Sequence, residues 1–145
     1  MIETIAHDEK IIALIISHRF SASGVHFVTP EEFSQQMAYM CHPAGRIIAP
    51  HTHNQVHRSV LQTQEALFVR RGKIRVDFYD PSQNYLDSRL IGTGDVILLA
   101  SGGHGFEFLE ESEVIEVKQG PYLGEEDKTR FDGATDAQIN VRVQR

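Results

Sequence analysis

The chain has 145 residues, which is the length of one ordinary domain and enough to bury a hydrophobic core without disulfide bonds. Its formal net charge of −6 argues against a general nucleic-acid role, which needs a basic surface, and against docking on anionic membranes. The single cysteine, Cys41, excludes an intramolecular disulfide, and acidic residues before the first apolar run argue against a signal peptide. We therefore expect a cytoplasmic protein.

Short apolar runs separated by turn residues predict an all-β protein. The first predicted strands are residues 11–17 and 25–28. After them, Thr29, Pro30 and Glu32 match the start of a helix, because threonine caps, proline suits the first helical position and glutamate suits the third. We expect a short helix from there through about Ala38.

From residue 46 onward the predicted strands follow one another closely. Gly72 separates two of them and is interpreted as a tight hairpin turn. Many short strands at regular spacing, with turn residues between them, favour a sandwich or a barrel. The strands expected are 46–50, 67–71, 73–79, 85–91, 96–99, 105–109 and 114–118.

The strand pattern ends near Gly120. We expect a single domain over residues 1–145, with a barrel core of about 45–119, a closing arm over 120–131 and a frayed or partner-dependent tail over 132–145. Residues 138–143 alternate well enough to form an edge strand of their own.

Three of the eight histidines lie between residues 51 and 57. On a strand, residues two apart face the same side, so His51 and His53 would present two imidazoles about 7 Å apart along the backbone. Imidazole suits zinc, iron, copper and nickel, and a carboxylate from another strand would also admit manganese. Taken alone, the pair is explained equally well as two surface histidines.

The residues around this pair resemble the first sequence motif of the cupin superfamily. Gly45, five residues, His51, one residue and His53 fit its first half, and Glu65, six residues and Gly72 fit its second half. The family leaves three or four residues between the second histidine and the glutamate, whereas eleven separate His53 from Glu65 here. We interpret the additional residues as an inserted loop over the barrel mouth.

A second cupin motif combines a glycine turn, an apolar strand and a lone histidine, and residues 94–104 resemble it. Ala100 stands where a proline is usual, and one residue is missing before the histidine. The whole resemblance covers roughly residues 45–118. It implies a double-stranded β-helix, or jelly-roll, barrel around one divalent metal ion (Zn, Fe, Mn or Ni), with His51, His53, Glu65 and His104 as ligands.

The choice of the third ligand stays open between two residues. His57 falls where the family's glutamate would lie if nothing were inserted. Glu65 keeps the spacing to Gly72, and alternation puts it on the same face as Leu67 and Val69. A carboxylate on an apolar inner face is costly unless a cation pairs with it. We therefore favour Glu65 and keep His57 as a rival or additional ligand.

Residues 115–131 resemble the end of type II phosphomannose isomerase domains, which suggests kinship with sugar-phosphate isomerases. Glu65 and Glu107 are the candidate catalytic residues, since carboxylates can move protons. The candidate substrate-binding residues, chosen for their positions near the motifs, are Arg58, Gln62, Gln64 and Tyr122.

These patterns favour a metal-dependent isomerase or epimerase acting on a small carbohydrate or sugar phosphate. The alternatives are a non-haem iron dioxygenase and a non-catalytic module that binds a small ligand, because a fold alone does not choose the chemistry. The expected partners are a small molecule and a second copy of the chain. Cupins commonly form homodimers through edge strands, and the predicted strand over residues 11–17 looks free to do so.

Overall fold

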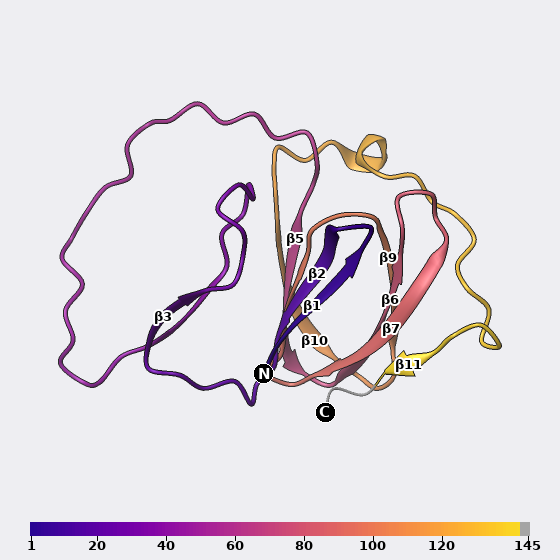
Figure 1. The fold of residues 1–145 in the computed structure, drawn as a ribbon, viewed down its shortest axis with the longest axis horizontal. Coiled ribbons are helices and arrows are strands. Elements are labelled where there is room, and N and C mark those ends of the chain that lie inside the picture. Colours follow the sequence, from indigo (N-terminus) through magenta and orange to yellow (C-terminus); the bar gives the residue numbers. More distant parts are fainter. Residues whose placement is uncertain (143–145) are drawn as a thin grey trace.

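The structure, a computed structural model, describes residues 1–142 and is all-β (Figure 1). A single 3-10 turn, η1 (Gly124–Asp127), interrupts the strands of this described part. The strands are β1 (Ile2–His7), β2 (Lys10–Ile16), β3 (Gly24–Phe27), β4 (Ala38–Cys41), β5 (Glu65–Arg71), β6 (Lys73–Tyr79), β7 (Tyr85–Gly92), β8 (Val96–Leu99), β9 (Gly103–Phe108), β10 (Glu113–Lys118) and β11 (Val141–Arg142).

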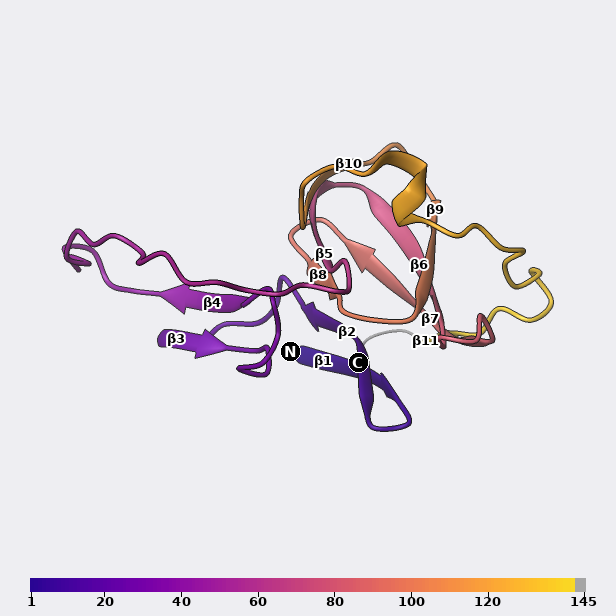
Figure 2. The ribbon, with the colours of Figure 1, turned by 90° about the horizontal axis from the view of Figure 1, so that it is seen from above.

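Two sheets form the body of the molecule (Figures 1 and 2). One has the strand order β1-β2-β8-β5-β10 and the other the order β11-β7-β6-β9. Neighbouring strands run antiparallel except for β11, which is parallel to β7. The core lies between the sheets, where alternation turns apolar side chains inward, among them Leu67 of β5, Val76 of β6 and Ile97 of β8. This arrangement is compatible with a β-barrel.

The predicted helix between Thr29 and Ala38 is wrong, because turns connect β3 to β4 there. Thr29 Oγ1 donates a hydrogen bond to Gln36 Oε1 and accepts one from the amide of Met37, so it does not cap a helix. The side-chain amide nitrogen of Gln36, Nε2, donates hydrogen bonds to three backbone carbonyls in the same turn. In a helix, backbone amides would donate to such carbonyls instead. Phe33 and Met37 then pack against the outer face of the five-stranded sheet.

Most of the predicted strands are confirmed to within two residues, and those over residues 73–79 and 96–99 match β6 and β8 throughout. The strand predicted over residues 46–50 is wrong, because that stretch has no strand pairing in the structure. The strand predicted over residues 11–17 is β2, and it lies between β1 and β8. It is therefore not free to pair with a second chain, contrary to the expectation.

Gly72 does not close a hairpin, so that prediction is also wrong. It turns the chain from one sheet into the other, since β5 pairs with β8 and β10 whereas β6 pairs with β7 and β9. Its φ of +98° lies in the left-handed region, and a Cβ there would collide with Ser112. As a result, β5 and β6 belong to different sheets, and side chains of both contribute to the core between them.

The β3–β4 ribbon and the chain that follows it extend away from the body (Figures 1 and 2). We call residues 42–61 the outer segment. It is exposed along its whole length and has no strand pairing. Residues 54–60, interpreted from the sequence as part of an inserted loop over the barrel mouth, lie within this segment, which extends away from the body instead.

After β10 the described chain crosses the body and reaches β7, with which β11 pairs. Its hydrogen bonds include those of the Tyr79 hydroxyl with the Ala134 amide and of the Tyr85 hydroxyl with Asn140. Of the edge strand expected over residues 138–143, the structure shows β11 alone: residues 138–140 form no strand, and Val143 lies outside the described residues. Within residues 1–142, no helix has the length and apolar character needed to cross a bilayer.

Candidate metal and substrate site

Glu65 and His104 meet on the inner faces of opposite sheets. Glu65 begins β5, and His104 lies on β9 opposite the buried Phe78 of β6. His104 Nε2 lies 3.4 Å from Glu65 Oε2, and Glu65 is only 7% exposed. The structure therefore brings a buried carboxylate into contact with an imidazole, as two of the expected metal ligands require.

The contact with His104 lowers the pKa of Glu65 below its ordinary value of 4.5, although burial acts in the opposite direction. The positive charges of Lys118 and Lys128 lower this pKa further. Glu65 is therefore ionised at neutral pH. A buried, ionised carboxylate is a natural place for a bound cation.

A cavity of about 860 Å³ opens beside this pair. Its walls come from β5, β6, β9 and β10, from the residues just before β5, and from the closing arm. Lys128 and Arg130 bring positive charge to it, Glu116 and Asp127 bring negative charge, and Phe106 and Phe131 supply apolar surface. The closing arm expected over residues 120–131 thus contributes directly to the cavity wall.

The remaining expected ligands lie elsewhere. His51, His53 and His57 belong to the exposed outer segment, and the rings of His51 and His53 are 5.3 Å apart. His51 Nδ1 contacts the Ala49 carbonyl at 3.0 Å, which leaves Nε2 free to bind. Among residues 1–142, no three His, Cys, Asp or Glu side chains converge closely enough to hold a metal ion.

The candidate substrate-binding residues are divided between the cavity and other places. Gln62 lines the cavity. Gln64 is buried and accepts hydrogen bonds from the connection between β3 and β4, so it holds that connection against β5. Arg58 lies in the outer segment and donates to the carbonyl of Val56. Tyr122 is 82% exposed and is not part of the cavity wall.

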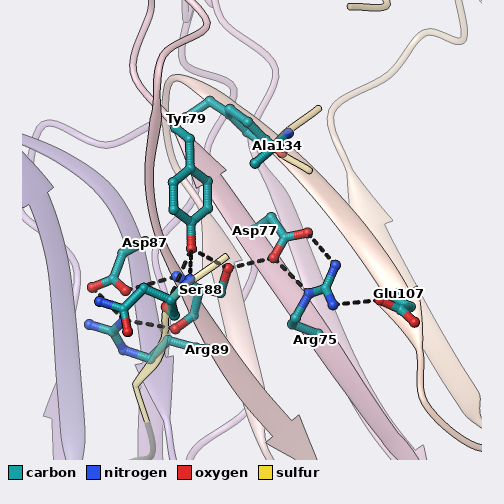
Figure 3. Close-up of polar contacts among 10 residues, drawn as sticks. Arg75, Asp77, Tyr79, Asp87, Ser88, Arg89, Glu107 and Ala134 are labelled. Atoms are coloured by element: carbon teal, nitrogen blue, oxygen red, sulfur yellow. Dashed lines mark hydrogen bonds and ion pairs between the residues drawn. The ribbon is translucent and has the colours of Figure 1, made fainter. Parts of the chain in front are cut away.

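Glu107 lies on the outer face of β9, away from the cavity. Its carboxylate contacts Arg75 Nη1 at 2.6 Å, and Arg75 Nε donates to Asp77, which also accepts from Ser88 (Figure 3). The contact with Asp77 raises the pKa of Arg75. These side chains connect β6, β7 and β9, and none of them lines the cavity. The position of Glu107 is that of a structural partner of Arg75.

Glu116 is a cavity residue that the sequence analysis did not single out. It lies opposite Leu67 in the pairing of β10 with β5, so it shares the inner face, while Ile115 and Val117 point to the outer face and are half-exposed. Hydrophobicity alone would assign the two faces the other way round. Glu116 could have been found from the sequence because it lies two residues before Lys118, which places both on the same face of β10. Lys118 lies opposite Glu65 in the pairing of β10 with β5.

Comparisons of this chain with protein-family models, with curated proteins and with solved structures gave no match. The likeness to cupins therefore depends on the motif residues between 45 and 118. The Glu65–His104 pair and the cavity beside it are the structural features that point to a function.

Proposed function

We propose that this chain is a cytoplasmic, metal-binding cupin that acts as an isomerase or epimerase on a small carbohydrate or sugar phosphate. The observation that carries the proposal is the buried, ionised Glu65 in contact with His104 beside a cavity. Two facing sheets of mostly antiparallel strands are compatible with the jelly-roll barrel that the motifs imply.

The donor atoms suit a divalent metal ion. Glu65 and His104 would hold it, and His51 and His53 are the further ligands that the motif implies. A carboxylate with neutral imidazoles suits zinc, iron, manganese or nickel. Such an ion, when bound, polarises a carbonyl oxygen of the substrate.

The other side chains of the cavity can bind the substrate and move a proton. Lys128 and Arg130 would attract a phosphate or carboxylate group. Glu116 is a carboxylate that could transfer a proton between neighbouring carbon atoms, which is the step that an isomerase or epimerase needs. Phe131 would limit the access of water. A cavity of about 860 Å³ is large enough for a sugar phosphate.

One observation favours the non-catalytic binding module as a second candidate. Of the expected ligands, only Glu65 and His104 come together beside the cavity within the described chain, and two protein ligands hold a metal ion less tightly than three or four. In that case the cavity would bind a small anion through Lys128 and Arg130 without turnover.

The first experiment is elemental analysis of untagged protein, beside the variants His51→Ala, Glu65→Ala and His57→Ala. We expect about one equivalent of a transition metal in the wild type, because a folded site with three or four ligands binds stoichiometrically. The metal should be lost from His51→Ala and Glu65→Ala and retained by His57→Ala. If the metal is lost from His57→Ala and retained by Glu65→Ala, then His57 and not Glu65 is the third metal ligand.

The metal-loaded protein is then tested for turnover. Interconversion of aldose and ketose phosphates supports the isomerase. Oxygen consumption with Fe(II) would instead identify a dioxygenase. Metal binding without turnover on either substrate panel would favour the binding module, and a protein that takes up none of the four metals contradicts the metal site itself.

A further inference from the structure

The body is open along β9. In the pairing of β9 with β6, Phe106 lies opposite Val76 and Phe108 lies opposite Ile74. Val76 and Ile74 are 0% and 1% exposed, whereas Phe106 and Phe108 are 37% and 57% exposed. Phe106 faces the cavity, and Phe108, on the same inner face, lacks the cover that its neighbours have.

The backbone of β9 is open as well. β9 ends the four-stranded sheet, and β10, the next strand along the chain, ends the five-stranded sheet. Each therefore has one edge without a partner strand within residues 1–142. Unpaired edges with apolar side chains are surfaces to which a further strand can add.

The outer segment has the properties of such a strand. Its hydrogen bonds, among the described residues, remain within the segment, and they run from Arg46 to Pro43, between His51 and Ala49, and from Arg58 to Val56. Its backbone groups are thus largely available for pairing. It also exposes large apolar side chains, namely Ile47, Ile48, Val56, Val60 and Leu61.

The charges of the two surfaces are complementary. The outer segment contains Arg46 and Arg58 and no acidic residue. Residues 103–118, which form β9, β10 and their connection, contain five glutamates and a single lysine, and four of these glutamates also form ion pairs with arginines or a lysine of their own chain. Opposite charges of this kind favour the docking of one surface on the other and fix its register.

The direction of the outer segment points to a second copy as the source of the strand. The β3–β4 ribbon carries the segment away from its own body, and β9 lies on the far side of β5 and β10 from it (Figures 1 and 2). The base of the ribbon is held by hydrogen bonds of Gln64 with Ser34 and Gln35. A strand anchored in this way reaches outward, where a neighbouring molecule would lie.

We propose that two copies of this chain exchange their outer segments, each adding a strand to the β9 edge of the other. The partner subunit's His51 and the partner subunit's His53 then complete the site that begins with Glu65 and His104. The role of the histidines rests on the proposed function, but the exchange itself does not. Reciprocal exchange uses the same surfaces twice, as a twofold dimer requires, and a segment of this length supplies much of a standard interface of roughly 20–30 residues a side.

Crosslinking between engineered cysteines tests the exchange without any metal. In a Cys41→Ser background, one chain carries Thr52→Cys in the outer segment and the other carries Gly105→Cys on β9. Gly105 suits this change because a Cβ there meets nothing within 4 Å. After the two chains are unfolded and refolded together, a short bis-maleimide should produce covalent dimers of one chain of each kind.

The double variant with both cysteines in one chain distinguishes exchange from folding back. When the double variant is refolded with an excess of cysteine-free chain, its partners carry no cysteine. It should then form almost no crosslinks, because an exchanged segment needs a cysteine on the partner to react with. An efficient link within one chain under these conditions overturns the proposal. The matched control pairs Thr52→Cys with Ser82→Cys, which lies in the exposed turn after β6 and should give no covalent dimer.

Complementation tests the shared site. Chains with His51→Ala and His53→Ala, and chains with Glu65→Gln and His104→Ala, should each bind no metal alone. Refolded together, they should recover about one metal ion per mixed dimer, because one of the two exchanged sites is then intact. No recovery, in a protein whose wild type binds metal, means that each chain builds its own site and contradicts the exchange.

The two proposals fail in different ways. A metal-free wild type that still gives the crosslink overturns the metal site and leaves the exchange supported. A wild type that binds metal as a monomer in sedimentation equilibrium, with no crosslink between chains, overturns the exchange and leaves the metal site supported.

Discussion

At the scale of single residues, the buried charge of Arg89 connects the two sheets. Arg89 Nε lies 2.6 Å from Glu3 Oε1 of β1, and Nη1 lies 2.8 Å from Asp87 Oδ2 of its own strand. Glu3 Oε2 is buried and has no hydrogen-bond partner within the described chain. The carboxylate of Glu3 therefore depends on Arg89, whereas Asp87 has Arg142 as a second partner at 2.9 Å.

We predict that Arg89→Met lowers the free energy of unfolding by about 3 kcal/mol, because it leaves the Glu3 carboxylate partly buried and unpaired. Urea unfolding followed by circular dichroism measures the change. Arg71→Met is the matched control: Arg71 pairs with Glu111 on the exposed surface, and its loss should cost less than about 1 kcal/mol. Equal effects of the two changes would show that the Arg89 pair is not distinguished by its burial.

At the scale of elements, the connection at Gly72 decides which strands become neighbours. The turn transfers the chain between sheets at a φ of +98°, and it leaves no room for a side chain beside Ser112. Ser112 lies in the connection between β9 and β10, which makes the same crossing in the opposite direction. The backbone amide of Lys73 donates a hydrogen bond to Ser112 Oγ, so the two crossings are in contact.

We predict that Gly72→Ala destabilises the protein by about 2 kcal/mol, since it combines a left-handed backbone with a steric collision. The measurement is again urea unfolding. Gly105→Ala serves as the control, because Gly105 has no positive φ and open space around it, and it should change stability by less than about 0.5 kcal/mol. A tolerated Gly72→Ala would mean that this connection can relax.

At the scale of the whole molecule, the proposed exchange of outer segments would couple folding to association. The exposed inner face of β9 would be covered only in the dimer, and so would the apolar side chains of the outer segment. Anything that binds the folded state stabilises it by mass action, and for a dimer the ligand is another copy of the chain.

We therefore predict that the Tm of the metal-free protein rises by roughly 5 °C over a hundredfold increase in protein concentration. Thermal unfolding followed by circular dichroism at several concentrations measures it. Replacing residues 46–60 by a short Gly-Ser linker should remove the concentration dependence. A wild-type Tm independent of concentration would contradict a dimer that forms through the outer segment.

The sequence by itself determined most of the strands and three of the residues at the cavity, namely Gln62, Glu65 and His104. The strands β6 and β8 and the acid at the head of β5 follow from alternation and turn chemistry, which act between near neighbours along the chain. Glu65 and His104 were both expected as ligands, and they do meet.

Only the tertiary structure decided how these pieces combine. The helix expected after Thr29 gave way to side-chain hydrogen bonds of Gln36 and to the packing of Phe33 and Met37 on the sheet. The inward direction of Glu116 follows from the register of β10 with β5, against the hydrophobic pattern of its own strand. The separation of His51, His53 and His57 from the cavity was likewise decided by the tertiary structure. Each of these outcomes depends on contacts between residues far apart in the sequence, and local periodicity carries no information about such contacts.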